Sequence, residues 1–469
     1  MRSHSSKRQL MDLIITGGTV VGETEALRAD VGVLNGRIAK LGDLRDHPAS
    51  KYIDARGLLV LPGGIDVHVH LSLPFGGTVS SDDFSSGSQA AAMGGTTTMF
   101  DFVSPSADTL LADSIQAHIA LGDRESMIDY ALHMIINDVS DETLAQLPDV
   151  LGLGITSLKA FTAYPDEGLM LQSSELTRLM QRAAALGAQV DVHAEDGERI
   201  EAIRQEYLSA GWSSMDYHPK SRPPATEVDA IRSVLAIAEK TRCATHIHHL
   251  STAEGLDLIR SARNPNVSAE TCMQYVLLDD TVYDSEHALL YAISPPLRRP
   301  RHAKALWSGL EDETVSILAT DHCPFTLEQK QGGALGFLDV PNGMPGVETR
   351  LPLLYSEAVA KRKWPLPLFV RLVATNPAKR FGLYPKKGVI MPGSDADIVL
   401  FDPKARQQLN HDQLHMNCDW SPYENLVVSG WPRMTFVRGQ LVCSEGEINS
   451  PLQRGRFVFR SSNLGGNES

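Results

Sequence analysis

The chain has 469 residues, 42% of them hydrophobic, and carries a net charge of −14. No run approaches the roughly 18–20 consecutive apolar residues of a membrane-spanning helix, and the acidic balance argues against the basic surface typical of nucleic-acid-binding proteins. We therefore predict a globular protein with neither a membrane nor a nucleic acid as its partner.

The first ten residues, MRSHSSKRQL, are polar and basic, and no apolar core of the kind found in secretory signals follows them. We expect residues 1–10 to be a flexible tail and the folded part to begin at Met11. The five cysteines are scattered and never form C-x-x-C, which argues against a disulfide framework and a structural zinc site and predicts a reducing, cytoplasmic location.

Residues 11–61 alternate apolar and polar positions around Gly-Gly, Asn-Gly and Arg-Gly turns, a pattern typical of short β-hairpins. The same pattern returns in residues 386–403 and 432–447. We therefore expect residues 11–61 and 385–450 to form one β domain, interrupted by a long insertion over residues 62–384.

The insertion alternates strand-like and helix-like segments. Its helical runs include a segment from residue 226 to 240, for which Thr226 is the expected N-cap. The expected strands are 64–71, 96–103, 129–136, 155–162, 188–195, 244–250, 267–273 and 315–321. Eight strands separated by helices predict an α/β fold of the (β/α)8 barrel type. A doubly wound open sheet is the alternative, but no G-x-G-x-x-G follows a strand.

The stretch LPGGIDVHVHL, residues 61–71, contains an H-x-H pair on an expected buried strand. Side chains two residues apart in a strand share a face, so His68 and His70 should lie side by side. Such a pair either binds a metal ion or forms hydrogen bonds within the core, and the stretch alone leaves both readings open.

Four more polar residues, Lys159, His193, His249 and Asp321, lie near the ends of other expected strands. In a (β/α)8 barrel these ends meet at the active-site face, so a shared metal site is favoured. A lysine ammonium has only donors and cannot bind a cation, whereas a carbamate formed from its amine and CO2 can bridge two metal ions. The alternative is a lysine paired with Asp101 or Glu195.

The chain resembles the dihydropyrimidinase/hydantoinase family of the amidohydrolase superfamily. The matching stretches are PGGIDVHVHL, FGGTVSSDDF, GGTTTMFDFV, SLKAFTAY, VHAEDGE, HHLST, ISPPLR, ATDHCPF and NGMPGVETR, which run in family order from about residue 61 to 350. The resemblance implies a small β-sandwich beside the barrel. It also implies an enzyme that opens cyclic ureides, such as dihydrouracil or hydantoins, to N-carbamoyl amino acids. Asp196 departs from the asparagine that is frequent in the family.

The resemblance further implies two divalent metal ions per chain, zinc being the best expectation, and it assigns the site residues. His68 and His70 would bind the more buried ion, His193 and His249 the outer one, and carbamylated Lys159 (N6-carboxylysine) would bridge them. Asp321 would be both a ligand and the proton-transferring base. Tyr164 would stabilise the oxyanion, and the substrate would also meet Ser294, Asn342, Leu71, Leu73, Phe75 and Phe161.

Some alternatives remain at this point. Strand alternation with His249 inward would turn His246 and His248 outward. Ser72 stands where dihydroorotases usually have arginine, which disfavours a carboxylate-bearing ring. Allantoinase activity is an alternative, as is a relative that has lost catalysis and acts as an assembly protein. The resemblance also implies a homotetramer, with residues 451–469 as a possible arm between subunits.

Overall fold

The computed structural model describes residues 9–105, 109–332, 336–449 and 455–461. The predicted tail 1–10 and the last residues, 462–469, therefore lie almost entirely outside the described residues. Within the described part of the chain, none of the helices combines the length and apolarity that a membrane span requires.

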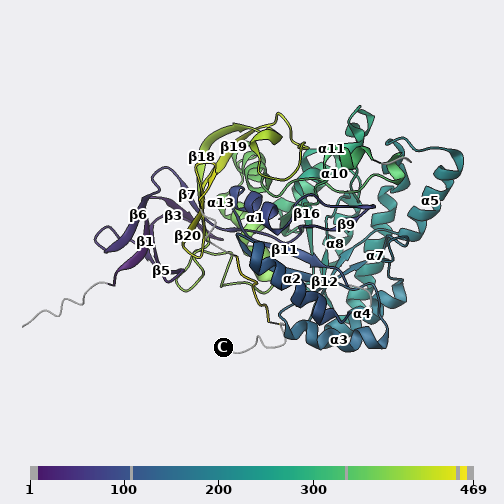
Figure 1. Ribbon diagram of the computed structural model, residues 1–469, viewed down its shortest axis with the longest axis horizontal. Helices are drawn as coiled ribbons and strands as arrows, with labels where there is room; N and C mark the ends of the chain where they lie inside the picture. Colours follow the sequence, from purple (N-terminus) through teal and green to yellow (C-terminus); the bar gives the residue numbers. More distant parts are fainter. Residues whose placement is uncertain (1–8, 106–108, 333–335, 450–454, 462–469) are drawn as a thin grey trace, which may run out of the picture.

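Eight parallel strands form the central sheet (Figure 1), which confirms the predicted barrel. In sheet order from one end they are β17 (Ile317–Ala319), β16 (Val267–Cys272), β15 (Ala244–Ile247), β14 (Gln189–His193), β13 (Ser157–Phe161), β12 (Asp129–Ile135), β11 (Thr96–Val103) and β8 (Gly64–Asp66). All eight residues of β11 are buried, as expected for a strand covered on both faces.

Polar contacts close the barrel between its first and last strands. The His70 amide donates to the His322 carbonyl at 2.7 Å, and the Thr320 hydroxyl donates to Asp66 at 2.7 Å. The fully buried Arg350 donates to the carbonyls of Ile65 and Leu318 at 2.8 and 2.9 Å. These contacts hold the segments after β8 and β17 together, and both segments carry predicted site residues.

Helices surround the sheet, as Figure 1 shows. They are α1 (Phe84–Met93), α2 (Leu111–Glu125), α3 (Asp141–Gly152), α4 (Ser173–Leu186), α5 (Gly197–Ala210), α6 (Tyr217–Ser221), α7 (Pro224–Thr241), α8 (Ala253–Ala262), α9 (Met273–Leu277), α10 (Pro300–Glu311), α11 (Leu327–Gln331), α12 (Arg350–Leu354), α13 (Leu366–Val370) and α14 (Asn376–Arg380). The predicted N-cap of α7 is wrong. The helix begins at Pro224, and the Thr226 hydroxyl donates to the Pro223 carbonyl instead. Proline at the first helical position is favoured because its missing N–H needs no partner there.

The two chain ends form one β domain, whose purple and yellow strands lie side by side in Figure 1. One sheet has β5 (Arg37–Gly42), β4 (Asp30–Leu34), β1 (Met11–Thr16) and β6 (Ala49–Asp54). The other has β21 (Glu447–Ile448), β20 (Gln440–Ser444), β19 (Val427–Val437), β18 (Ile398–Gln408), β7 (Leu59–Pro62), β2 (Thr19–Val21) and β3 (Ala26–Arg28). The register of β18 against β7 joins residues almost 340 positions apart, such as Ile398 and Pro62.

A buried lysine connects this β domain to the barrel. Lys387 donates to Asp129 at the start of β12 at 2.7 Å, and it also pairs with Asp397 and Asp395. These three carboxylates are close enough to suggest a cation site. The lysine ammonium already supplies the positive charge among them, so we read the group as a structural ion-pair network.

Residues 455–461 pack on the barrel of their own chain. The Gly455 amide donates to the Ser126 carbonyl and the Val458 amide to the Tyr130 carbonyl, both at 2.7 Å. Arg460 is buried and donates to the Ser157 hydroxyl at 3.0 Å. An arm between subunits and a homotetramer stay predictions, and residues 451–454 and 462–469 lie outside the described residues.

Candidate active site

Three predicted ligands meet just beyond β8 and β17. The Nε2 atoms of His68 and His70 lie 3.2 Å apart, and Asp321 Oδ1 lies 3.1 Å from the first and 3.2 Å from the second. Ligand atoms about 2.0–2.1 Å from a zinc ion in a tetrahedral arrangement are separated by roughly 3.3 Å. All three distances agree with that value, so these residues fit a metal ion.

A buried carboxylate fixes the orientation of His68. Its Nδ1 lies 2.5 Å from Glu270 Oε1, and both side chains are buried. Burial lowers the pKa of His68 well below its usual value, so its imidazole is neutral at physiological pH. A metal ion on Nε2 would require the proton of His68 on Nδ1, where Glu270 lies close enough to share it.

The second histidine pair follows β14 and β15. His193 Nδ1 lies 2.9 Å from His249 Nε2, and His193 Nε2 contacts Glu195 at 3.0 Å. Glu195 also forms a buried ion pair with Arg222. Burial alone would raise the pKa of Glu195, but Arg222 and His193 hold that pKa at about 2. The carboxylate is therefore charged, and it directs His193 Nδ1 towards His249.

Lys159 lies on β13 with its side chain 1% exposed. Among the described residues its Nζ makes neither a hydrogen bond nor an ion pair; it lies over the rings of Phe161 at 4.8 Å and Phe102 at 5.4 Å. The alternative partners are engaged elsewhere, because Asp101 binds His118 and Glu195 binds Arg222. Burial lowers the pKa of Lys159 to about 8, which favours the neutral amine that carbamylation by CO2 requires.

The prediction that His246 and His248 point outward is wrong. His246 Nε2 lies 3.2 Å from Glu270, and His248 Nδ1 lies 2.6 Å from His68 Nδ1, so both occupy the barrel interior. Strand alternation fails at His249 because β15 ends at Ile247 and His249 has a φ of +34°.

His68, His248 and Glu270 form a further close group of potential ligands. Two of their separations, 2.5 and 2.6 Å, are too short for ligands of one metal ion. They are hydrogen-bond distances. Glu270 and His248 therefore hold the His68 ring by hydrogen bonds, and this group is not an additional metal-binding site.

An inner cavity of about 160 Å³ opens beside these ligands. Tyr164, Ser294 and Asn342 line it, as do the predicted apolar residues Leu73, Phe75 and Phe161, together with all six predicted metal ligands. Leu71 does not line it. Its side chain packs against Gly87 of α1 in the core, so the structure removes Leu71 from the predicted substrate pocket.

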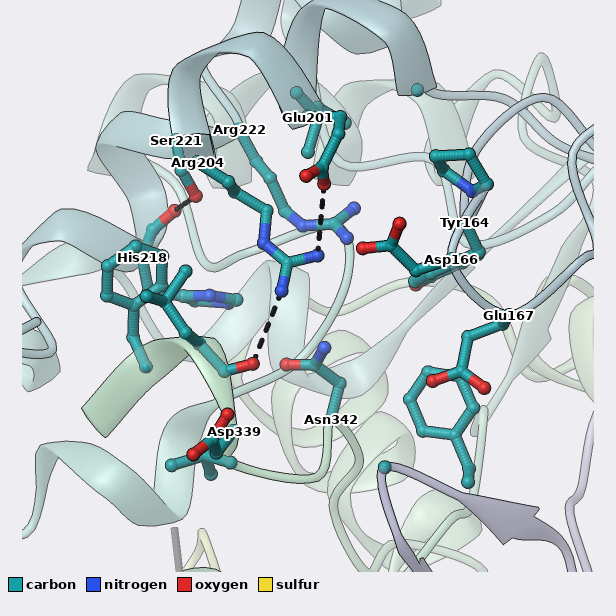
Figure 2. A pocket seen from close by; sticks show the side chains of 18 of the residues that line it. Tyr164, Asp166, Glu167, Glu201, Arg204, His218, Ser221, Arg222, Asp339 and Asn342 are labelled. Atoms are coloured by element: carbon teal, nitrogen blue, oxygen red, sulfur yellow. Dashed lines mark hydrogen bonds and ion pairs between the residues drawn. The ribbon is translucent and has the colours of Figure 1, made fainter. Parts of the chain in front are cut away.

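A second hollow of about 420 Å³, which we call the outer vestibule, shares Phe75, Tyr164, Glu167 and Asn342 with the inner cavity. Figure 2 shows Arg204 reaching towards Glu201, with Tyr164 and Glu167 on the opposite side. Arg204 Nη1 lies 3.6 Å from Glu201 Oε2. The vestibule therefore gives a polar, charged approach to a cavity with a largely apolar wall.

A family model described as the amidohydrolase family matches residues 59–442. The chain belongs to the amidohydrolase family. It is 38% identical to a D-hydantoinase from Geobacillus stearothermophilus over 96% of this chain and 97% of that protein. It is 36% identical to a D-phenylhydantoinase from Escherichia coli over 96% of this chain and 98% of that protein. The crystal structure of a dihydropyrimidinase from Brevibacillus agri NCHU1002 superposes with a TM-score of 0.93 at 38% identity, covering 96% and 98% of the two chains. The predicted resemblance is confirmed.

Sequence reasoning missed the residues that support the ligands of this amidohydrolase. Glu270 and Arg222 lie 202 and 29 positions from the histidines they serve, His68 and His193, and Arg222 acts through Glu195. Nothing in the spacing of these residues indicates such contacts. The one available signal was a buried-strand glutamate in VSAETCM, because a carboxylate on such a strand needs a partner.

Proposed function

We propose that this protein is a binuclear metal-dependent cyclic amidohydrolase that opens hydantoins or dihydropyrimidines to N-carbamoyl amino acids. The observation that carries the proposal is the triangle of His68, His70 and Asp321, with sides of 3.1–3.2 Å. This triangle faces the same inner cavity as Lys159, His193 and His249.

His68, His70 and Asp321 would hold one divalent ion and His193 and His249 the other, with Lys159 shared as its carbamate. Bound divalent ions of this kind supply a water of lowered pKa and polarise a carbonyl. We propose zinc as the metal, because zinc binds imidazole nitrogen and carboxylate oxygen ligands of this kind. The orphaned, buried amine of Lys159 supports the carbamate.

Asp321 and Tyr164 would carry out the remaining steps. Asp321 would accept the proton of the attacking water and pass it to the leaving ring nitrogen, as a general base and then a general acid. Burial raises the pKa of Tyr164 to about 12 against the opposing effect of Arg222. Its phenol therefore keeps its proton at neutral pH and would donate a hydrogen bond to the oxygen of the attacked carbonyl.

The cavity wall supports a preference for unsubstituted or apolar ring substituents. Leu73, Phe75 and Phe161 line it together with Ile135 and Leu169. No arginine or lysine other than Lys159 lines this cavity among the described residues, which argues against a carboxylate-bearing ring such as dihydroorotate. We further propose a cytoplasmic homotetramer, as the family resemblance implies.

The test combines elemental analysis of the purified protein with hydrolysis assays on dihydrouracil, hydantoin, 5-phenylhydantoin, allantoin and dihydroorotate. We expect about two divalent ions per chain and turnover of the first three rings. Protein that stays metal-free and inactive after incubation with zinc and bicarbonate would refute the proposal, and turnover of dihydroorotate alone would refute the substrate class.

A further inference from the structure

Lys330 on α11 is completely buried and makes no ion pair with any described residue. Its Nζ donates to the carbonyls of Ala292 at 3.0 Å and Pro341 at 2.8 Å, and it lies 5.7 Å from the ring of Phe325. A buried ammonium without a countercharge is costly, so its two carbonyl contacts need an explanation.

The two carbonyls belong to two separate segments of the inner cavity. Ala292 precedes Ile293 and Ser294, whereas Pro341 precedes Asn342, and all three following residues line the cavity. The Gly343 amide also donates to the Ala292 carbonyl at 2.9 Å. Lys330 therefore completes a bridge between the segments that carry Ser294 and Asn342.

A further hydrogen bond holds the first segment, and the second segment carries a polar atom that is free to bind a ligand. His218 holds the first segment from the vestibule side, because its Nε2 donates to the Ile293 carbonyl at 2.7 Å. Asn342 Oδ1 is buried and has no hydrogen-bond partner in the described protein. A substrate amide N–H is the chemical group that would satisfy this acceptor.

We propose that Lys330 is a positioning residue that sets the spacing between the Ser294 and Asn342 segments, and thereby the fit of the substrate's ring amides. The proposal rests on the function proposed above. Burial lowers the pKa of Lys330 to about 7. Because even the neutral amine has two N–H donors, the bridge to the two carbonyls holds in either charge state.

The first experiment uses the holoenzyme and Lys330→Met, which keeps the approximate volume and removes the donors. Steady-state kinetics with hydantoin should show KM raised about tenfold or more and kcat lowered about threefold or less, because a misplacement of about 1 Å is enough for such losses. The metal content should equal that of the wild type. Lys330→Gln keeps two donors on a shorter side chain, so its KM should lie between those of the wild type and Lys330→Met. Glu328→Gln, at an exposed position of the same helix, should have the KM and kcat of the wild type.

Hydrogen exchange measured by mass spectrometry tests the bridge independently of turnover. Peptides containing residues 292–294 and 341–343 should exchange about tenfold faster in Lys330→Met, whereas a peptide from β11 should not change. If Lys330→Met changes neither KM nor the hydrogen exchange of these two peptides, the proposal is wrong and Lys330 serves only to pack the core. An inactive wild type would refute the proposed function, and exchange alone would then decide whether Lys330 bridges the segments. If Lys330→Met does not fold, the same two measurements on Lys330→Gln decide.

Discussion

Glu195→Gln removes the charge of a buried carboxylate that both Arg222 and His193 contact. A buried charge that loses its partner destabilises a protein by about 3–5 kcal/mol. The pKa of Glu195 gives an independent figure. Its lowering from 4.5 to about 2 corresponds, at about 1.36 kcal/mol per pKa unit, to about 3 kcal/mol of stability. We therefore expect the free energy of unfolding at pH 7 to fall by about 3 kcal/mol.

The sign of the pH dependence follows from the direction of this pKa. A carboxyl whose pKa is lower in the folded state stabilises the protein fully above its unfolded pKa and loses that contribution as the pH falls. The difference in the free energy of unfolding between wild type and Glu195→Gln should thus be largest above pH 4.5. It should shrink to about 1 kcal/mol near pH 3.

The assay is urea unfolding of chelator-treated protein followed by tryptophan fluorescence, since bound metal would add its own stabilisation. Glu206→Gln, at an exposed position of the neighbouring helix α5, is the matched control and should change little. A loss of stability that stays constant from pH 7 to pH 3 would refute the reasoning, because the loss would then come from packing and not from charge.

Four further changes test the site. Lys159→Ala should abolish nearly all turnover, and added short-chain carboxylic acids should restore part of it in the same assay; full activity without them would exclude the carbamate. Asp321→Asn should still bind hydantoin in calorimetry but turn over at least about 100-fold more slowly, and unchanged kcat would remove it from the proton path. Glu270→Gln should weaken zinc affinity in a chelator competition by about 10–100-fold, so equal affinity would deny its support of His68. Phe161→Ala should lower kcat/KM for 5-phenylhydantoin more than for hydantoin, and equal losses would place Phe161 outside the substituent pocket.

The sequence was sufficient for the barrel because the barrel follows from local patterns, whereas the roles of the metal ligands come from the family resemblance and stay predictions. Strand-like and helical segments alternate in order along the chain, and His68 and His70 lie side by side as predicted, although both follow the end of β8 at Asp66. The predicted Lys159, His193, His249 and Asp321 line the same cavity.

Two of the errors arise where a residue leaves regular strand geometry. His246 and His248 were assigned to the outer face by alternation, but the chain turns at His249, so both lie inside beside Glu270 and His68. Leu71 follows the end of β8, where the backbone no longer dictates which side chains face the cavity. Long-range partners such as Arg222 are invisible to any local pattern, since only the closed barrel brings them together.

The pairing of the two chain ends in the β domain determines when this protein can finish folding during translation. Strand β7, which leads directly into the barrel, pairs with β18, and Arg460 packs against Ser157 on β13. While the ribosome is still translating the barrel, the edge of β7 and the base of the barrel therefore lack their partners. These contacts form only after β18 and then Arg460 have emerged from the ribosome. Premature termination before residue 398 would thus leave an exposed sheet edge in an otherwise folded intermediate, the kind of surface that chaperones and proteases recognise.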